Sequence, residues 1–337
     1  MKALVTGATG FLGSHIAERL VQRGEQVRAL VRPTSRTSFL EGLGVEIVRG
    51  DVTDAPSLPA ALSGVDVVYH AAAMVSDWAA WDEFKSVTIG GTRNMLKAAR
   101  DANVGRFLYV STDGVYRYQD LRHGVTEETP MERHFGAFDY YRRSKTAAER
   151  IVRKYMERGD LPVTIVRPAL ILGERDAAML PGVIQHLSLP GSIYLGSGRN
   201  RLPIVYAGDV AELSILAATN LPSAGQTYNA VNEEYVTQRD LFAITSEEAG
   251  VPSPKRSLPF RAAYTAALAM ELSSRVRGWS HRPSLTRFSA NLLGIDYVES
   301  SAKAGHELGW KPEVGYREAV RRSVEWSRRR RAQPISG

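Results

Sequence analysis

A tyrosine and a lysine stand four residues apart in the middle of the chain, at Tyr141 and Lys145. In a helix this spacing puts both side chains on one face. A lysine charge beside a phenol favours the phenolate and lowers the tyrosine pKa from its usual value of about 10. Such a tyrosine exchanges a proton with a substrate hydroxyl or carbonyl near neutral pH. Tyr140 competes for the role, but Ser144 is its partner at this spacing, and an ordinary surface pair would look the same.

Two hydroxyl side chains, Ser111 and Thr112, stand where the predicted strand 106–111 ends. A hydroxyl group here would polarise the same oxygen that Tyr141 protonates. In open α/β sheets the active site forms beyond the carboxyl ends of the strands. Because this strand and the helix that carries Tyr141 and Lys145 are consecutive elements, the sequence predicts that these groups form one proton-transfer site.

A glycine-rich turn near the N-terminus, TGATGFLG at residues 6–13, joins the first predicted strand to the first predicted helix. Gly7 permits a tight turn, Gly10 lets the backbone approach a pyrophosphate, and Gly13 lets the helix pack closely on the strand. The first turn of the helix offers free N–H groups to phosphates. A plain strand–helix turn is the alternative, but the position at the start of a βαβ unit favours a dinucleotide site. Its predicted contacts are Gly7, Thr9, Gly10, Phe11, Leu12 and Gly13.

Arg32 stands at the end of the second predicted strand, where NAD sites carry an acidic residue for the ribose 2′-hydroxyl. Segment 30–36 contains no carboxylate. A guanidinium suits a 2′-phosphate by its charge and by its bidentate geometry. The sequence therefore predicts NADP(H) as the cofactor and disfavours NAD. The alternative is that Arg32 is a solvated surface side chain.

The elements that must position these residues alternate between short apolar strands and amphipathic helices, which indicates βαβ units. We predict an α/β fold, a Rossmann-type doubly wound parallel sheet with a smaller C-terminal substrate-binding α/β region. The predicted division is a dinucleotide-binding domain over 1–172, a mainly substrate-binding region over 173–330 that partly returns to the sheet, and a basic tail over 331–337. The predicted strands are 2–5, 26–31, 46–48, 66–70, 106–111 and 163–167, and the predicted helices are 11–22, 83–103, 138–157, 209–219, 238–249 and 317–329.

Composition excludes several other functions. The 337 residues contain no cysteine, which excludes disulfides, iron–sulfur clusters and thiol nucleophiles, and the seven histidines lack metal-ligand spacing. The net charge of +7 gathers only in the arginine run 328–331, so we expect no nucleic-acid partner. No leader or membrane-spanning segment is predicted, and the apolar segment 258–272 is predicted to be a buried helix rather than a membrane-surface one. We expect a cytoplasmic protein without stable membrane insertion.

These motifs together resemble the extended short-chain dehydrogenase/reductase family. Besides the glycine turn, the similar stretches are HAAA at 70–73, STDGVY at 111–116, YRRSK at 141–145, RPALILG at 167–173, VYAGDVA at 205–211 and ELGWKP at 307–312. The resemblance implies hydride transfer at the nicotinamide C4, with Tyr141 as acid/base and Lys145 on the nicotinamide ribose. It matches Thr112 to the catalytic hydroxyl, with Ser111 as a neighbour.

The resemblance also assigns the cofactor contacts. It places Asp51 and Val52 against the adenine, and Ala71 and Ala72 beside the cofactor. Two further residues, Pro168 and Ala169, would lie near the nicotinamide. A turn role for Asp51 is the alternative. Relatives often form a homodimer through the helices that are here 83–103 and 138–157, so the resemblance implies a homodimer.

The stretch RPSLTRF at 282–288 and the apolar segment before it are similar to the 3β-hydroxysteroid dehydrogenase-like branch. This similarity implies a secondary alcohol or ketone on a hydrophobic substrate, sterol-like or 3-oxoacyl. Apolar residues predicted to form a lid fit a greasy pocket, although core packing explains them equally well. The sequence leaves the same two roles open for Trp78 and Trp81, which are lining the pocket and packing as half-buried side chains. The predicted lid residues are Met179, Leu180, Leu187, Leu189, Tyr194 and Leu195.

Three other functions share parts of this pattern. Sugar-nucleotide dehydratases carry an Asp-Glu pair, whereas here Gly114 follows Asp113, which argues against elimination. A sugar-nucleotide epimerase would use the same Thr/Tyr/Lys triad with a tightly bound dinucleotide, but the arginine that helps to bind diphosphate is displaced by one position, at Arg201. The third is a sensor that binds a dinucleotide and catalyses no reaction, and the intact triad argues against it.

One position departs from the family pattern, since Thr88 stands where an asparagine is usual.

Overall fold

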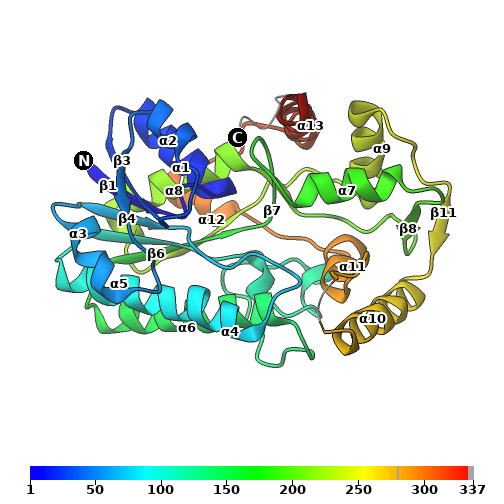
Figure 1. Cartoon of the computed structure of the whole chain (residues 1–337), viewed down its shortest axis with the longest axis horizontal. Helices are drawn as coiled ribbons and strands as arrows, with labels where there is room; N and C mark the ends of the chain where they lie inside the picture. Colours follow the sequence, from blue (N-terminus) through cyan, green and yellow to red (C-terminus); the bar gives the residue numbers. More distant parts are fainter. Residues whose placement is uncertain (279–280, 333–337) are drawn as a thin grey trace.

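A seven-stranded sheet forms the centre of the computed structural model, which describes residues 1–278 and 281–332 (Figure 1). The strand order is β10-β6-β5-β4-β1-β2-β3, and all neighbouring strands are parallel. The order reverses between β1 and β4, which is where open α/β sheets bind their ligands. The predicted Rossmann-type sheet is confirmed. Its strands are β1 (Lys2–Thr6), β2 (Gln26–Val31), β3 (Glu46–Arg49), β4 (Val67–His70), β5 (Arg106–Val110), β6 (Val163–Pro168) and β10 (Thr227–Ala230).

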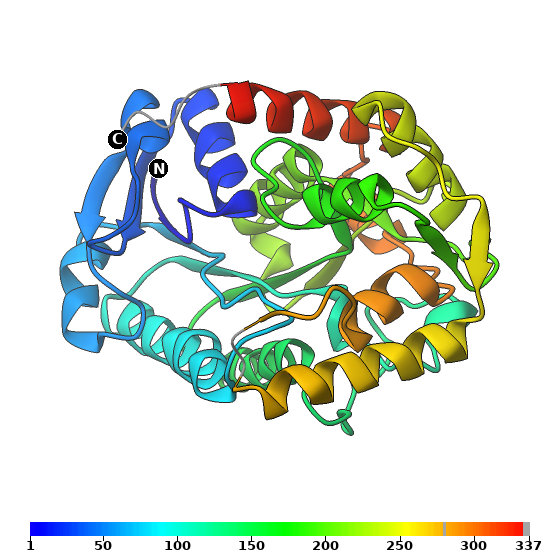
Figure 2. The ribbon, with the colours of Figure 1, turned by 45° about the vertical axis from the view of Figure 1, so that its right-hand side comes forward.

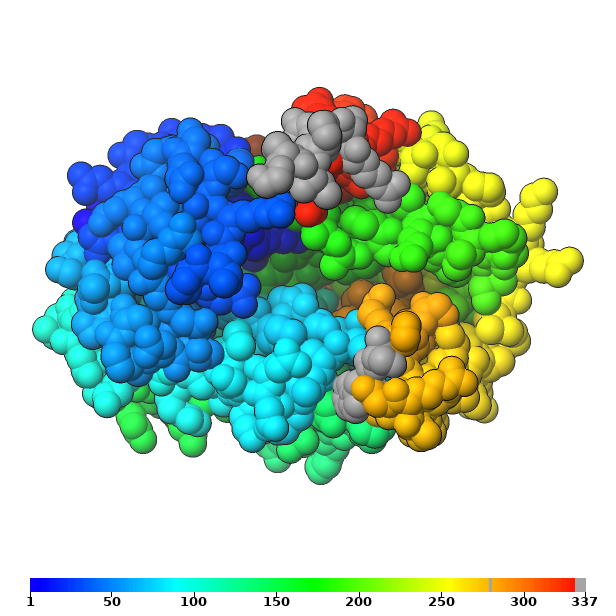
Figure 3. Space-filling view, in the orientation of Figure 1, coloured from blue at the N-terminus to red at the C-terminus, as the bar shows by residue number. Residues whose placement is uncertain are grey.

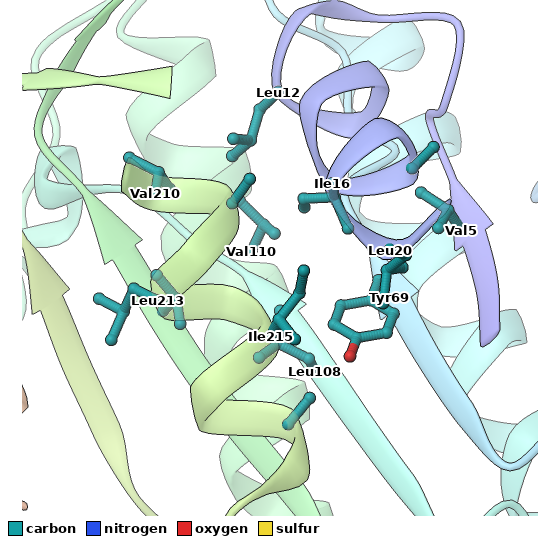
Figure 4. Close-up of a cluster of buried hydrophobic side chains, with 14 of the residues drawn as sticks. Val5, Leu12, Ile16, Leu20, Tyr69, Leu108, Val110, Val210, Leu213 and Ile215 are labelled. Atoms are coloured by element: carbon teal, nitrogen blue, oxygen red, sulfur yellow. The ribbon is translucent and has the colours of Figure 1, made fainter. Parts of the chain in front are cut away.

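Helices cover both faces of the sheet. On one face, α1 (Phe11–Gln22) and α8 (Ala207–Thr219) enclose a buried cluster that includes Ile16, Leu108 and Ile215 (Figure 4). On the other face, α5 (Gly91–Asp101) and α6 (Tyr140–Arg158) pack with short helices over a second buried cluster. The short helices between the first strands are α2 (Ser38–Gly42), a 3-10 turn (Ala55–Ser57), α3 (Leu58–Leu62) and α4 (Trp81–Glu83).

Two predicted helices differ from the structure where the backbone cannot continue as an α-helix. The predicted helix 83–103 is a π-helical segment, Phe84–Gly90, followed by α5. Gly91 at this junction lies against Val52, since a Cβ there would stand 2.7 Å from a methyl group of that valine. The predicted helix 138–157 begins only at Tyr140, because Phe138 adopts a left-handed backbone with φ of 71°.

The second half of the chain completes the sheet with α8 and β10 and adds an outer layer. The helix predicted over 258–272 is present as α10, which runs along one edge of the molecule (Figure 2), but it is not a buried helix, since only Ala263, Ala267 and Glu271 in it are buried. The sequence did not predict α11. The helices are α7 (Met179–Ser188), α9 (Gln238–Ala249), α10 (Phe260–Val276), α11 (Arg287–Gly294), α12 (Ala302–Leu308) and α13 (Tyr316–Ala332), and the strand pairs are β7 (Leu170–Leu172) with β9 (Ile204–Tyr206) and β8 (Ile193–Leu195) with β11 (Arg256–Leu258). Short 3-10 turns span Asp113–Val115, Leu121–His123 and Leu221–Ser223.

The residues predicted to form a lid lie mostly in the core of this outer layer. Leu180, Leu187 and Tyr194 belong to one buried cluster, and Leu195 belongs to another. Leu189 is exposed. Packing therefore explains the buried side chains of this set but not the exposed Leu189. Of the predicted basic tail 331–337, the first two residues continue α13 and the rest lie outside the described residues.

None of the helices within residues 1–278 and 281–332 combines the length and the apolar character needed to cross a membrane.

Candidate active site

The end of β5 and the start of α6 meet at the predicted proton-transfer site. The Lys145 amine donates a hydrogen bond to the carbonyl oxygen of Val110 across 2.6 Å, which ties α6 to the last residue of β5. The Thr112 side chain lies near enough to the Tyr141 hydroxyl to lower the pKa of that phenol. The structure thus brings Thr112, Tyr141 and Lys145 together at the carboxyl edge of the sheet.

Burial controls the acidity of Tyr141. It raises the pKa of the phenol to about 12, with the Thr112 hydrogen bond acting against the rise and the Asp113 carboxylate adding to it. Burial also lowers the pKa of Lys145 to about 7, and its amine is bound to a backbone carbonyl. The expectation that the lysine charge makes this tyrosine more acidic is wrong for this arrangement. The phenol keeps its proton at neutral pH.

Thr112 is held in a turn directly after β5. Its hydroxyl donates to a carboxylate oxygen of Asp113 at 3.0 Å and accepts from the backbone N–H of Gly114 at 3.1 Å. Burial raises the pKa of Asp113 to about 6, against the hydrogen bonds from Thr112 and Gly114 and the charge of Arg142. A carboxyl group that titrates near neutrality therefore stands next to the hydroxyl that contacts Tyr141.

Ser111 faces a buried ion pair. Its hydroxyl donates to Glu149 at 2.6 Å, and Glu149 is paired with Arg167 at 2.5 Å. The two charged side chains are 0% and 1% exposed. Arg167 also donates to the Tyr116 hydroxyl at 2.8 Å. Ser111 therefore anchors the end of β5 to this network, and Thr112 is the hydroxyl that influences the pKa of Tyr141.

The glycine turn has the close packing that a dinucleotide cradle requires. Gly7 has φ of 72°, and a Cβ on it would stand 2.8 Å from the backbone nitrogen of Ala72. A Cβ on Gly13 would stand 2.2 Å from the carbonyl oxygen of Gly7. Thr9 and Gly10 are exposed at the N-terminus of α1, which no side chain caps, and Phe11 and Leu12 follow in its first turn. These residues fit a pyrophosphate bound to the backbone.

A buried histidine fixes the loop that packs on this turn. His70, the last residue of β4, shares hydrogen bonds with Thr6 at 2.8 Å and with Thr92 at 3.1 Å. Burial lowers its pKa to about 3, so the ring is neutral. The N–H of Ala72 bonds to the same Thr6 hydroxyl, and Ala71 stands between them in the chain. The loop after β4 is therefore held against the glycine turn.

The region predicted for the adenine is well ordered by hydrogen bonds. The Asp51 carboxylate accepts two bonds of 2.8 Å from Thr53, so the turn role of this residue is real. Val52 is buried, and its carbonyl oxygen accepts from Asn94 on α5 at 3.0 Å.

Arg32 is exposed in the loop after β2. The guanidinium of Arg49 lies beneath this loop and donates to the carbonyl oxygens of Arg32, Pro33 and Ser35 at 3.2 to 3.5 Å. The loop backbone is thereby fixed while the Arg32 side chain remains accessible.

The two residues predicted to lie near the nicotinamide, Pro168 and Ala169, are buried at the end of β6. The N–H of Ala169 bonds there to the carbonyl oxygen of Ala230.

Segments far apart in sequence close the substrate side of the site. The Tyr141 ring packs edge-on against Phe288 of α11, with ring centroids 5.6 Å apart. Asp77 in the loop after β4 binds the guanidinium of Arg282 at 2.8 and 2.7 Å and the hydroxyl of Thr286 at 2.8 Å. A small pocket here is lined by Ser76, Asp77, Ala79, Phe84, Phe138, Asp139, Tyr140, Tyr141, Arg275 and Phe288.

The two tryptophans lie beside this pocket, each under an arginine. The guanidinium of Arg275 lies 4.5 Å from the Trp78 ring centre, and that of Arg143 lies 4.5 Å from the Trp81 ring centre. Figure 3 shows that the surface is hollowed between α7 (green) on one side and α4 (cyan) and α11 (orange) on the other. Thr88 supplies a hydrogen bond of its own, since its hydroxyl accepts from the N–H of Met74 at 3.0 Å.

Sequence reasoning missed several residues that shape the site. Glu149 had a signal, because it stands four residues after Lys145 on α6 and so shares its helix face. Arg167 had one as well, because it is a charge inside an apolar strand. Asp77 had none, because its partner Arg282 is 205 residues away in the chain.

Curated relatives with reductase and dehydrogenase activities match nearly the whole chain. A ketoreductase of Stigmatella aurantiaca, described as acting on 4-hydroxy-2-methyl-3-oxo-4-farnesyl-3,4-dihydroquinoline-1-oxide, is 31% identical over 95% of both chains. A 2-alkyl-3-oxoalkanoate reductase of Stenotrophomonas maltophilia is 31% identical over 96% of this chain and 98% of its own. A 3β-hydroxysteroid dehydrogenase/Δ5→4-isomerase of Mycobacterium tuberculosis is 29% identical over 92% of this chain and 86% of its own.

Solved structures share the fold. The protein gox2253 superposes with a TM-score of 0.79 at 34% identity, over 97% of this chain and 98% of its own. A UDP-glucuronic acid 4-epimerase of Bacillus cereus, solved with NAD, has a TM-score of 0.74 at 22% identity, over 98% and 99% of the two chains. At that identity the likeness to the epimerase concerns the fold alone.

The family model described as NAD dependent epimerase/dehydratase matches residues 3–231, two thirds of the chain. The predicted family resemblance is thereby confirmed, as is the prediction of an enzyme that uses a nicotinamide dinucleotide. This chain belongs to the NAD-dependent epimerase/dehydratase family, the extended short-chain dehydrogenases/reductases.

Proposed function

We propose that this enzyme interconverts a ketone and a secondary alcohol on a hydrophobic substrate, with NADP(H) as its cofactor and Tyr141 as its general acid/base. The observation that carries the proposal is the bond from the Lys145 amine to the Val110 carbonyl oxygen, which sets the start of α6, with Tyr141, against the end of β5, with Thr112, at the carboxyl edge of the sheet. Two full-length relatives whose names describe ketone reduction support the same reaction class.

The protonation state of Tyr141 and the positions of Thr112 and Lys145 suit the reduction of a ketone. A reduced nicotinamide, when bound, supplies a hydride. Tyr141, whose pKa is raised to about 12, holds a proton at neutral pH and donates it to the substrate oxygen. The Thr112 hydroxyl orients the Tyr141 hydroxyl. Lys145, anchored on the Val110 carbonyl, fixes the start of α6 and presents an amine that would bind the nicotinamide ribose.

The cofactor preference rests on Arg32. Its side chain is exposed and its loop is fixed from below by Arg49, so a guanidinium is available to a 2′-phosphate. We expect Arg32→Ala to raise KM for NADPH by about tenfold or more, as for the loss of a charged hydrogen bond, and to leave KM for NADH nearly unchanged. Arg199→Ala, an exposed arginine elsewhere, is the control. Equal effects on both cofactors would refute the preference.

The hydrophobic substrate is supported by the rings around Tyr141. Phe288 packs against it, and Phe84 and Phe138 line the same pocket. The epimerase alternative has less support, because Arg201 is bound to both carboxylate oxygens of Asp296 at 2.9 and 2.5 Å and is therefore not available to a diphosphate.

A turnover assay with a matched pair of variants tests the function. NADPH absorbance is followed with a long-chain 2-alkyl-3-oxoalkanoate, a 3-ketosteroid and UDP-glucose. We expect net NADPH consumption with the ketones and none with the sugar nucleotide. Tyr141→Phe should lower kcat by roughly 10²- to 10⁴-fold without changing the affinity for NADPH, and Tyr155→Phe on the same helix should have no such effect. A Tyr141→Phe enzyme that remains active would refute the acid/base role.

We also propose a homodimer through α5 and α6, by resemblance to the family. Light scattering that shows only a monomer at all concentrations would contradict it.

A further inference from the structure

The loop between β7 and α7, residues 173–178, is fastened to the dinucleotide-binding half of the molecule by Arg175. Its guanidinium donates to the Ser14 hydroxyl at 2.8 Å and to the Glu18 carboxylate at 2.6 Å, and both of these residues belong to α1. The same guanidinium lies 4.6 Å from the centre of the Phe39 ring on α2. One side chain from the second half of the chain therefore bridges α1 and α2.

The residue before Arg175 is held to α1 as well. The imidazole of His15 on α1 is hydrogen-bonded to the carbonyl oxygen of Glu174 at 2.8 Å, and the Tyr206 hydroxyl donates to the Glu174 carboxylate at 2.8 Å. The His15 ring also packs edge-on against the rings of Phe11 and Tyr206, with centroids 5.7 and 6.0 Å away. Two successive residues of the loop are therefore fixed to the same helix.

These contacts fall on the two segments that fit the cofactor. Ser14 directly follows Gly13 of the glycine turn, and its hydroxyl donates to the carbonyl oxygen of Phe11 at 2.7 Å. Phe39 lies in α2, which begins where the loop that carries Arg32 ends. A dinucleotide with its pyrophosphate at the start of α1 has its adenosine part between these two segments. Arg175 therefore joins the second half of the chain to both walls of the adenosine site.

The backbone at Arg175 has a left-handed conformation, with φ of 71°, which a residue other than glycine rarely adopts. Such a conformation persists only where the surrounding contacts impose it, and it is concentrated at ligand clamps and switch regions. The end of the loop is fixed, because the Asp176 carboxylate accepts from three N–H groups in the first turn of α7 at 2.7 to 2.9 Å. The strained residue is therefore the one that makes the bridge.

The bridge spans a polar hollow instead of an apolar core. A cavity of about 310 Å³ lies between α1, the loop and the start of α8, and it is lined mainly by charged and polar side chains. The Arg175 and Glu18 side chains are 18% and 29% exposed, so solvent reaches their ion pair. Opening the bridge exchanges these contacts for contacts with water, which costs less free energy than exposing the core of the sheet.

We propose that Arg175 is a clasp that retains the dinucleotide, closed across α1 and α2 while the cofactor is bound and open when the cofactor enters or leaves. Arg175 acts as a positioning residue, through Ser14 and Phe39, on the segments that hold the cofactor. The proposal requires a dinucleotide, which membership of the family implies, and it depends neither on the ketone substrate nor on the preference for NADP(H). Release of a cofactor by such an opening can limit the rate of turnover.

The dissociation rate of NADPH tests the clasp, measured by stopped-flow fluorescence with excess NADP⁺ as the displacing ligand. We expect Arg175→Ala to raise this rate about tenfold, as for the loss of a charged hydrogen bond, and to change the association rate by less than about twofold. Arg175→Lys keeps a charge opposite Glu18 and should restore part of the slow dissociation. Arg23→Ala is the matched control, because Arg23 pairs with Glu212 at the other end of α1, and its rates should stay at the wild-type values.

Two results would overturn the clasp. One is a dissociation rate in Arg175→Ala that equals that of Arg23→Ala. The other is an association rate that falls as much as the dissociation rate rises, because a merely structural defect would damage the empty site. Thermal unfolding without cofactor checks that each variant folds, and NADH takes the place of NADPH if the enzyme prefers it.

Hydrogen exchange tests the same clasp at equilibrium. Bound NADPH should slow the exchange of the amides in 173–178 severalfold in the wild-type protein, and it should have little effect there in Arg175→Ala. Equal slowing in both proteins, or none in the wild-type protein, would contradict the clasp. A protein that shows this slowing and reduces no ketone would count against the proposed function alone.

Discussion

On the β5–α6 side of the site the chemical groups are held by buried contacts between residues close in sequence, whereas the contact of the α10–α11 side with the loop after β4 joins distant residues and reaches solvent. Lys145 bonds to Val110, 35 residues away, and Glu149 pairs with Arg167, 18 residues away, with both charges fully buried. Arg282 and Asp77 are 205 residues apart, and the arginine side chain is 57% exposed.

The difference indicates that proton transfer and substrate recognition have different structural requirements. A buried charge pair tolerates little movement, which suits groups that must keep their distances to one another. Ion pairs whose arginine is exposed to solvent are weak and screened, so the contact of the loop after β4 with the segment before α11 is held less firmly than the buried pair. The substrate side is therefore the side on which we expect specificity to vary.

The largest effect should follow from breaking the buried pair. Arg167→Met removes the only fully buried cation that pairs with Glu149 among the described residues, and we expect a loss of about 3–5 kcal/mol in the free energy of unfolding. Arg153 contacts the same carboxylate from a half-exposed position, so Arg153→Met should cost only about 1 kcal/mol or less. Urea unfolding measures both. Equal losses would show that burial does not distinguish the two arginines.

A smaller loss should follow from filling the glycine turn. A Cβ on Gly13 would meet the carbonyl oxygen of Gly7, so Gly13→Ala must displace backbone; we expect it to lower stability by about 1–3 kcal/mol and to weaken NADPH binding. Gly42 in α2 has open space around it, so Gly42→Ala should be neutral or slightly stabilising. Calorimetry of unfolding and of NADPH binding tests the pair. A Gly13→Ala protein with unchanged affinity for NADPH would show that the glycine turn does not contribute to cofactor binding.

The contrast between the β5–α6 side and the α10–α11 side also decides which features of the site could be predicted from the sequence. The strands around the glycine turn and the helix with Tyr141 and Lys145 were predictable, because local periodicity and glycine geometry specify them. The acidity of Tyr141 was not, because it depends on burial and on Asp113, which spacing on a helix does not show. Nor was the contact of Asp77 with the α10–α11 side, because Asp77 acquires its role only when two segments 205 residues apart meet.

The smallest effect on stability should come from the contact between these two segments. Arg282→Ala removes an exposed arginine from Asp77, whose side chain is only 10% exposed but keeps its hydrogen bond from Thr286, so we expect a loss of about 1 kcal/mol or less in the free energy of unfolding. KM for a long-chain ketone should nevertheless rise severalfold while kcat changes little, because Asp77 lines the pocket beside Tyr141 and loses its anchor. Arg317→Ala removes a similarly exposed arginine from its pair with Glu247, which does not line the pocket, and its KM should stay at the wild-type value. If both variants left KM unchanged, the α10–α11 contact would be only structural, and the recognition of the substrate would have to be sought on the β5–α6 side.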